Sequence, residues 1–130
     1  MTVYTAGYGN RQFNEFVALL TENKITLVID VRSKPYSGWN GCYNKPYLMR
    51  NMPMRYWSWG EDCLGGMEDV PKEAFQIAID EIVMLSRQER ICLMCSEKQA
   101  EPSRYLKEGC HRWRVIAPAL EKRGVTVIHL

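Results

Sequence analysis

Residues 25–31 read ITLVIDV, an almost unbroken run of β-branched and aliphatic side chains. Such a run is typical of a strand that is buried on both faces, as in a parallel sheet. Charged residues stand at its end: Asp30 lies inside the run and Arg32 follows it. The stretch therefore predicts both the fold class and the position of a polar site.

Further strands and helices alternate on either side of this run. Segments 3–6, 90–95 and 125–130 have the apolar pattern of strands. Helices are predicted over residues 13–23, from Pro71 onward and over residues 111–122, with Pro118 disturbing the last of them. This alternation predicts an α/β fold: a single three-layer domain over residues 1–130, with a four-stranded, mainly parallel sheet flanked by helices.

The composition limits the class of protein. The chain has 130 residues, and its 17 Lys and Arg against 15 Asp and Glu leave a formal net charge of +2. This charge is far from the basic balance of a protein that binds duplex DNA. We find neither the pattern of an export signal nor an apolar run of about 18 residues, so we expect a cytoplasmic protein without a membrane partner. The odd number of cysteines, five, is typical of reduced thiols rather than of a disulfide framework.

A long aromatic loop is expected between residue 33 and about residue 70. Residues 31–60 contain no acidic residue, five basic residues and half of the aromatic residues of the chain. Basic groups bind phosphates and aromatic rings stack on bases, so Trp39 and Tyr43 are candidates for contacting a substrate. The alternative is that these rings pack a small satellite core.

Polar side chains follow each predicted strand where it ends. In open parallel sheets, ligands bind beyond these carboxyl ends. Arg32 could hold a phosphate or carboxylate, or form an internal ion pair. Glu97 could be a general base if it is partly buried, and Tyr8 could donate a hydrogen bond to substrate. The candidate residues at these strand ends are Tyr8, Asp30, Arg32, Ser33, Cys95 and Glu97.

Cys110, His111 and Arg112 open the last predicted helix. A helix start binds anions and lowers the pKa of a thiol, so Cys110 could be a nucleophile, with His111 carrying the proton and Arg112 holding a phosphate. The alternative is structural: Cys110 fills a gap in the core and His111 binds a loop carbonyl. We predict no cofactor and no metal ligands. A zinc site of Cys95, Glu97, Cys110 and His111 remains geometrically possible, whereas Cys92 and Cys95 should point to opposite faces of their strand.

Six motifs carry a resemblance to a known family. The chain resembles the domain-of-unknown-function 488 family of bacterial and archaeal proteins, and the motifs occur in the order of that family over nearly the whole chain. The resemblance implies a compact α/β fold and a polar site built from these motifs, without a settled reaction. The motifs are TAGYG (5–9), DVRSKPYS (30–37), LGG (64–66), MCSE (94–97), CHR (110–112) and VIH (127–129).

The position of Cys95 also resembles that of the thiol in rhodanese-like proteins. The short cradle expected there, which leads from the cysteine into a helix, is replaced by a fourteen-residue insertion over residues 96–109. Three functions therefore stay open. The first is an enzyme directed at a nucleotide or at single-stranded nucleic acid, with an anion-binding pocket for the phosphate. The second is thiol-based transfer of sulfur or phosphoryl groups, and the third is a binding module without catalysis.

Overall fold

The computed structural model describes residues 1–66 and 71–130. Its sheet has five strands in the order β3-β2-β4-β1-β5, and every pair of neighbours is parallel. The predicted α/β class is confirmed, but the predicted number of four strands is wrong. The strands are β1 (Thr2–Gly7), β2 (Leu27–Asp30), β3 (Arg55–Ser58), β4 (Ile91–Cys95) and β5 (Thr126–His129).

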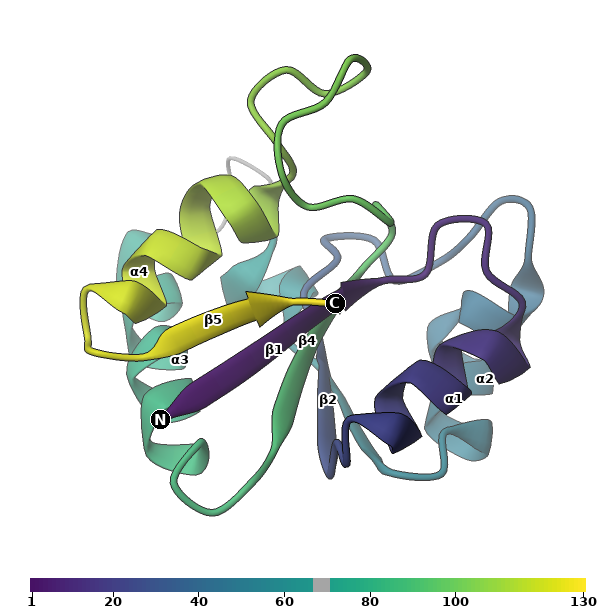
Figure 1. Cartoon of the computed structure of the whole chain (residues 1–130), viewed down its shortest axis with the longest axis horizontal. Coiled ribbons are helices and arrows are strands. Elements are labelled where there is room, and N and C mark those ends of the chain that lie inside the picture. Colours follow the sequence, from purple (N-terminus) through teal and green to yellow (C-terminus); the bar gives the residue numbers. More distant parts are fainter. Residues whose placement is uncertain (67–70) are drawn as a thin grey trace.

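Helices cover both faces of the sheet (Figure 1). Helices α1 (Phe13–Glu22) and α2 (Lys45–Asn51) lie on one side, and α3 (Lys72–Leu85) and α4 (Ala117–Glu121) lie on the other. In β2, Val28 packs into the core beneath α1, while Leu27 and Ile29 pack into the core beneath α3. Both faces of this strand are buried, which explains its continuous apolar sequence. None of the helices in the described ranges is long and apolar enough to cross a lipid bilayer.

The aromatic loop is largely regular structure. It contains a 3-10 turn (Gly41–Tyr43), α2, β3 and a π-helical turn (Gly60–Leu64). Strand β3 was missed because its sequence, RYWS, has no run of aliphatic or β-branched residues and follows Pro53 closely. The predicted end of the loop, near residue 70, lies outside the described residues.

Tyr43 belongs to the core, contrary to its expected role in contacting substrate. It is 0% exposed, and its hydroxyl donates a hydrogen bond to the carbonyl oxygen of Arg11 at 2.8 Å. The ring of Tyr43 packs against Phe13, Phe16 and Tyr8. For this residue, the alternative of a packed aromatic cluster is the one that the structure supports.

The last helical segment begins where the sequence predicts. It starts with a π-helical turn (Arg112–Ile116) that continues into α4. The N–H of Ala117 donates to the carbonyl of Arg112, one residue further back than in an α-helix. This wider turn lies directly before Pro118, which has no N–H to donate, so the expected disturbance by the proline is present.

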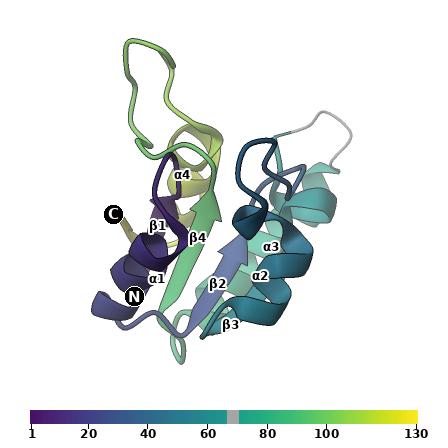
Figure 2. The same ribbon diagram turned by 90° about the vertical axis from the view of Figure 1, so that its right-hand side faces the viewer.

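The carboxyl ends of the strands meet at one edge of the molecule. Figure 2 shows β2 and β4 ending on the side from which the loop between β4 and the last helical segment projects. At this edge, the N–H groups of Tyr8 and Gly9 donate to the carbonyls of Cys95 and Ser96 at 3.1 and 2.9 Å. The end of β1 is thereby fastened to the start of the loop.

Candidate functional site

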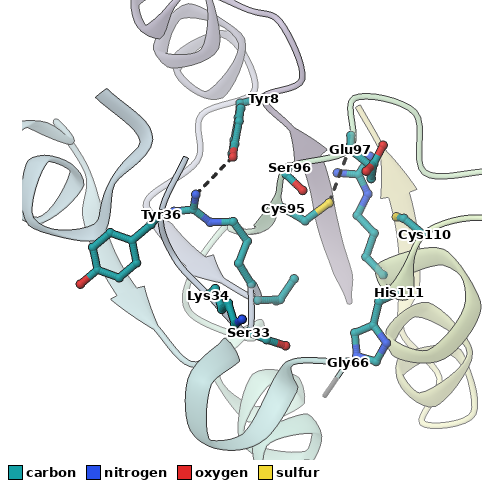
Figure 3. A pocket seen from close by; sticks show the side chains of 13 residues that line it. Tyr8, Ser33, Lys34, Tyr36, Gly66, Cys95, Ser96, Glu97, Cys110 and His111 are labelled. Atoms are coloured by element: carbon teal, nitrogen blue, oxygen red, sulfur yellow. Dashed lines mark hydrogen bonds between the residues drawn. The ribbon is translucent and has the colours of Figure 1, made fainter. Parts of the chain in front are cut away.

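A cavity of about 380 Å³ opens at the carboxyl ends of β1, β2 and β4 (Figure 3). Eight of the eleven candidate residues line it: Tyr8, Arg32, Ser33, Cys95, Glu97, Cys110, His111 and Arg112. Asp30, Trp39 and Tyr43 do not line it. Lys34, Tyr36 and Ser96 also line the cavity but were not among the candidate residues. Each of them directly neighbours a candidate residue or follows one by a few positions. Their position after β2 and β4 was the signal that could have identified them.

Asp30 and Arg32 form a buried, bidentate ion pair. Arg32 donates from Nε to Oδ1 at 2.9 Å and from Nη2 to Oδ2 at 2.7 Å. Its backbone N–H donates to Oδ1 at 3.1 Å, and the Tyr56 hydroxyl donates to Oδ2. Burial opposes the charge on Arg32, but the hydrogen bonds and charge of Asp30 outweigh it, so the pKa of the guanidinium is raised. The internal ion pair is therefore present, and Asp30 positions Arg32 rather than facing the cavity.

Arg32 also connects the ion pair to Tyr8. Its Nη1 donates to the Tyr8 hydroxyl at 3.3 Å, and its guanidinium carbon lies 5.4 Å from the centre of the Tyr8 ring. Figure 3 shows this hydrogen bond at the side of the cavity opposite Cys110. One wall of the cavity is thus fixed by polar contacts between β1 and β2.

Arg112 is completely buried, at 0% exposed. Its Nη2 donates to the carbonyl of Lys98 at 3.2 Å, but Nε and Nη1 have no hydrogen-bond partner among residues 1–66 and 71–130. No carboxylate forms an ion pair with it in that part of the chain. Arg112 belongs to the cavity lining although its side chain is buried, and its expected role of holding a phosphate stays a prediction. Burying a cation without a counter-charge lowers the stability of the folded protein. The groups that surround Arg112 therefore have to be considered as possible counter-charges.

The thiols of Cys95 and Cys110 lie close to Arg112. Figure 3 shows both sulfur atoms on the same side of the cavity. The neighbouring Cys95 thiol is the main cause that lowers the pKa of Cys110 to about 6. Burial acts against this shift, while the N–H of Trp113 and the charge of Arg112 support it. The neighbouring Cys110 and burial raise the pKa of Cys95 well above its ordinary value. The arrangement favours a thiolate on Cys110 and a protonated thiol on Cys95.

Cys92 differs from these two thiols. It is 0% exposed and packs with Met94 in the core beneath α1, whereas Cys95 packs toward the core beneath α3. The prediction that Cys92 and Cys95 point to opposite faces is confirmed. Burial raises the pKa of Cys92 to about 12, so this thiol is an apolar core residue.

His111 connects the helix start to the turn after β3. Its Nε2 lies 2.7 Å from the carbonyl oxygen of Leu64, and burial lowers the pKa of its imidazole. A neutral ring that donates from Nε2 to this carbonyl satisfies both observations. The structural alternative for His111, that it binds a loop carbonyl, is therefore the one that the structure supports.

Glu97 and Trp39 are both exposed. The partial burial expected to tune Glu97 as a general base is absent. Trp39 is 60% exposed but lies outside the lining of the cavity. Tyr36 is 59% exposed and belongs to the lining, which makes it the aromatic ring that a ligand in the cavity could reach.

Gly7 sets the distance between β1 and the loop after β4. A Cβ atom at Gly7 would lie 1.6 Å from the carbonyl oxygen of Glu97. The missing side chain of Gly7 thus lets two backbone segments of the chain pack against each other. Gly7 thereby allows Cys95 and Glu97 to stay beside Tyr8.

The possible zinc site is not assembled. Within the described ranges, no group of three or more His, Cys, Asp or Glu side chains could hold a metal ion. Cys95 and Cys110 lie together, but exposed Glu97 and the His111 ring, bound to Leu64, do not complete a ligand set with them.

No family model, no curated protein and no solved structure matches this chain. The resemblances to the domain-of-unknown-function 488 family and to rhodanese-like proteins therefore stay predictions from the motifs.

Proposed function

We propose that the protein is a thiol-dependent enzyme that acts on a small anionic substrate, with Cys110 as the nucleophile. The observation that carries this proposal is the buried guanidinium of Arg112, which has two unpaired N–H groups and no carboxylate partner in the described residues. A thiolate on Cys110 supplies the counter-charge that this cation lacks.

The environment of Cys110 suits nucleophilic chemistry. The thiolate is the reactive form of cysteine, and at neutral pH a thiol with a pKa of about 6 is mostly ionised. The neighbouring Cys95 thiol favours this ionised form and keeps its own proton. Cys110 is only 6% exposed, but it lines the cavity. A small substrate in the cavity could therefore reach its sulfur.

The opposite side of the cavity suits an anion. Lys34 is exposed at the lining and Arg32 is held there by Asp30, while Ser33 and Ser96 add hydroxyl groups. The volume of about 380 Å³ is in the range of small-molecule sites. Transfer of a sulfur or phosphoryl group from an anionic donor to Cys110 fits these features. We place this activity in the cytoplasm, where thiols are kept reduced.

A nucleotide is the second candidate ligand. The exposed ring of Tyr36 at the cavity could stack on a base, while Lys34 binds the phosphate. Single-stranded nucleic acid would use the same contacts and could extend to the exposed ring of Trp39. A binding module without catalysis predicts that such ligands bind without turnover.

The test is the alkylation rate of each cysteine as a function of pH, measured with iodoacetamide and peptide mass spectrometry. We expect Cys110 to react with an apparent pKa of about 6. Cys63 of the same protein is the reference thiol, because it is half-buried, lies outside the cavity lining and has a raised pKa through burial. If all cysteines react slowly and with ordinary thiol pKa values, the proposal is wrong.

A further inference from the structure

We infer that Cys95 and Cys110 are a dithiol pair that exchanges with a small, negatively charged disulfide bound in the cavity, Cys110 attacking first and Cys95 resolving the mixed disulfide. This inference rests on the proposed nucleophilic role of Cys110 and adds the substrate class and the second thiol.

The backbone brings the two thiols together across the fourteen residues that separate them. Cys95 ends β4 and Cys110 precedes the π-helical turn. The N–H of Cys110 donates to the carbonyl of Ala100 at 2.9 Å, so the loop closes close to where it began. Gly109 has a φ of +81°, a left-handed conformation that turns the chain directly before Cys110. The pair is thus held by the fold at the two ends of one loop.

The different environments of the two thiols indicate which of them reacts first. The neighbouring thiol of Cys95, the N–H of Trp113 and the charge of Arg112 all favour the thiolate of Cys110. Cys95 stays protonated, and its sulfur lies 3.7 Å from the carbonyl oxygen of Glu97, an alternative acceptor for its proton. The ionised sulfur attacks an external disulfide, and the protonated neighbour is available for the second step.

The reaction balances without a further reagent. The Cys110 thiolate forms an S–S bond to one sulfur of the substrate RSSR, whose own S–S bond breaks, and RS⁻ leaves and is protonated. Cys95 then loses its proton and attacks the Cys110 sulfur, which releases the second RS⁻ and passes the proton to it. The protein dithiol loses two electrons to become a disulfide, and RSSR gains two electrons to become two RSH. Excess thiol reverses both steps.

The charges of the cavity favour an anionic disulfide. On the β2 side of the lining, Asp30 balances the charge of Arg32, whereas Lys34 forms no ion pair within residues 1–66 and 71–130. The carboxylate of the lining, Glu97, stands on the other side, after β4. Carboxylates on the substrate would be attracted to Lys34, whereas a neutral disulfide gains nothing from it. Lys34 is exposed and can be altered without removing the buried ion pair.

The test is the reaction of the reduced full-length protein with oxidised glutathione, followed by intact mass spectrometry. We expect the wild type to lose two hydrogens through an internal Cys95–Cys110 disulfide, identified by peptide mapping. Cys95→Ser should instead accumulate a glutathione adduct on Cys110, and Cys110→Ser should react at least about 10-fold more slowly. Cys63→Ser is the matched control and should behave as the wild type.

A second measurement tests the substrate charge. We expect oxidised glutathione to react at least about 10-fold faster than neutral hydroxyethyl disulfide, and Lys34→Ala to reduce this preference. Lys122→Ala, on an exposed residue at the end of α4, is the control. Equal rates with the two disulfides would overturn the anionic substrate.

The outcomes separate the inference from the proposed function. If Cys110 is alkylated rapidly but the wild type keeps a stable glutathione adduct or forms none, the dithiol pair is wrong and the nucleophilic role of Cys110 stands. If Cys110 is alkylated as slowly as Cys63, both the dithiol pair and the nucleophilic role of Cys110 are wrong.

Discussion

The ring of Tyr8 stacks on the ring of Tyr43, with centroids 4.0 Å apart and an angle of 9° between the planes. Tyr43 lies in the core, while the hydroxyl of Tyr8 reaches Arg32 at the cavity. The completely buried ring of Tyr43 therefore supports the side of the cavity that Tyr8 and Arg32 form.

Replacing Tyr43 tests this support. We expect Tyr43→Ala to lower the free energy of unfolding by about 3–5 kcal/mol, as for other large aromatic core residues. Tyr43→Phe removes only the hydrogen bond to Arg11 and should cost about 1 kcal/mol. Urea denaturation measures both. Tyr105→Ala, at a residue that is 91% exposed, is the control, and an equal effect at positions 43 and 105 would contradict the role of Tyr43.

The ion pair of Asp30 and Arg32 should be more sensitive than an ion pair on the surface. Asp30→Asn leaves a buried guanidinium without its counter-charge, so we expect a loss of about 3–5 kcal/mol in the free energy of unfolding. Asp80→Asn is the matched control, because the Arg123–Asp80 pair has a similar distance, 2.6 Å, but is partly exposed. Its expected cost is below about 1 kcal/mol. Similar losses in the two variants, measured by denaturation, would argue against a structural role for Asp30.

The ionisation of Cys110 should make stability depend on pH. Its pKa is lowered to about 6 in the folded protein, whereas an unfolded thiol has a pKa of about 8.5. The resulting stabilisation is complete above the unfolded pKa and is lost as the pH falls through about 6. Between these values, the wild type should lose stability relative to Cys110→Ser by at most about 1.4 kcal/mol per pH unit of acidification. Urea denaturation of both proteins at several pH values checks this, and a difference independent of pH would contradict it.

Arg112 should control both the acidity of Cys110 and the redox equilibrium of the thiol pair. Arg112→Met removes the charge that favours the thiolate, so the apparent pKa of Cys110 in alkylation should rise. A disulfide carries no charge to balance Arg112, so the variant should form the disulfide more readily, by about 10-fold in equilibrium with glutathione. Arg112→Lys keeps a cation at this position and is the control. An unchanged pKa in Arg112→Met would show that the guanidinium does not act on Cys110.

Gly7 offers a test of the packing between β1 and the loop after β4. Gly7→Ala would place a methyl group 1.6 Å from the carbonyl oxygen of Glu97, so the loop backbone must shift. We expect a loss of about 1–3 kcal/mol in stability and a slower alkylation of Cys110. Gly38→Ala is the control, because nothing lies within 4 Å of a Cβ at that position. Thermal unfolding that is unchanged in Gly7→Ala would contradict the close contact.

Much of the fold could be predicted because its central strands leave clear patterns. Val28 and Ile29 face opposite sides of a sheet that is covered on both faces, which produces a continuous apolar run. Strand β3 has no such pattern, since its residues at the sheet edge are only half-buried or exposed. The position of the site followed from the strand ends. The burial of Arg112 could not be predicted, because a basic residue at a helix start is normally exposed and no local pattern marks it as part of the core.

The loop over residues 96–109 returns close to its own first residues, because the N–H of Cys110 donates to the carbonyl of Ala100. The entropy of closing a loop grows only slowly with its length, so doubling its length costs about 0.6 kcal/mol. The exposed tip at Tyr105 and Leu106 is therefore a suitable place to graft a foreign peptide, such as an epitope or a fluorescent reporter. A reporter placed there would move with the chain segment that joins the two thiols.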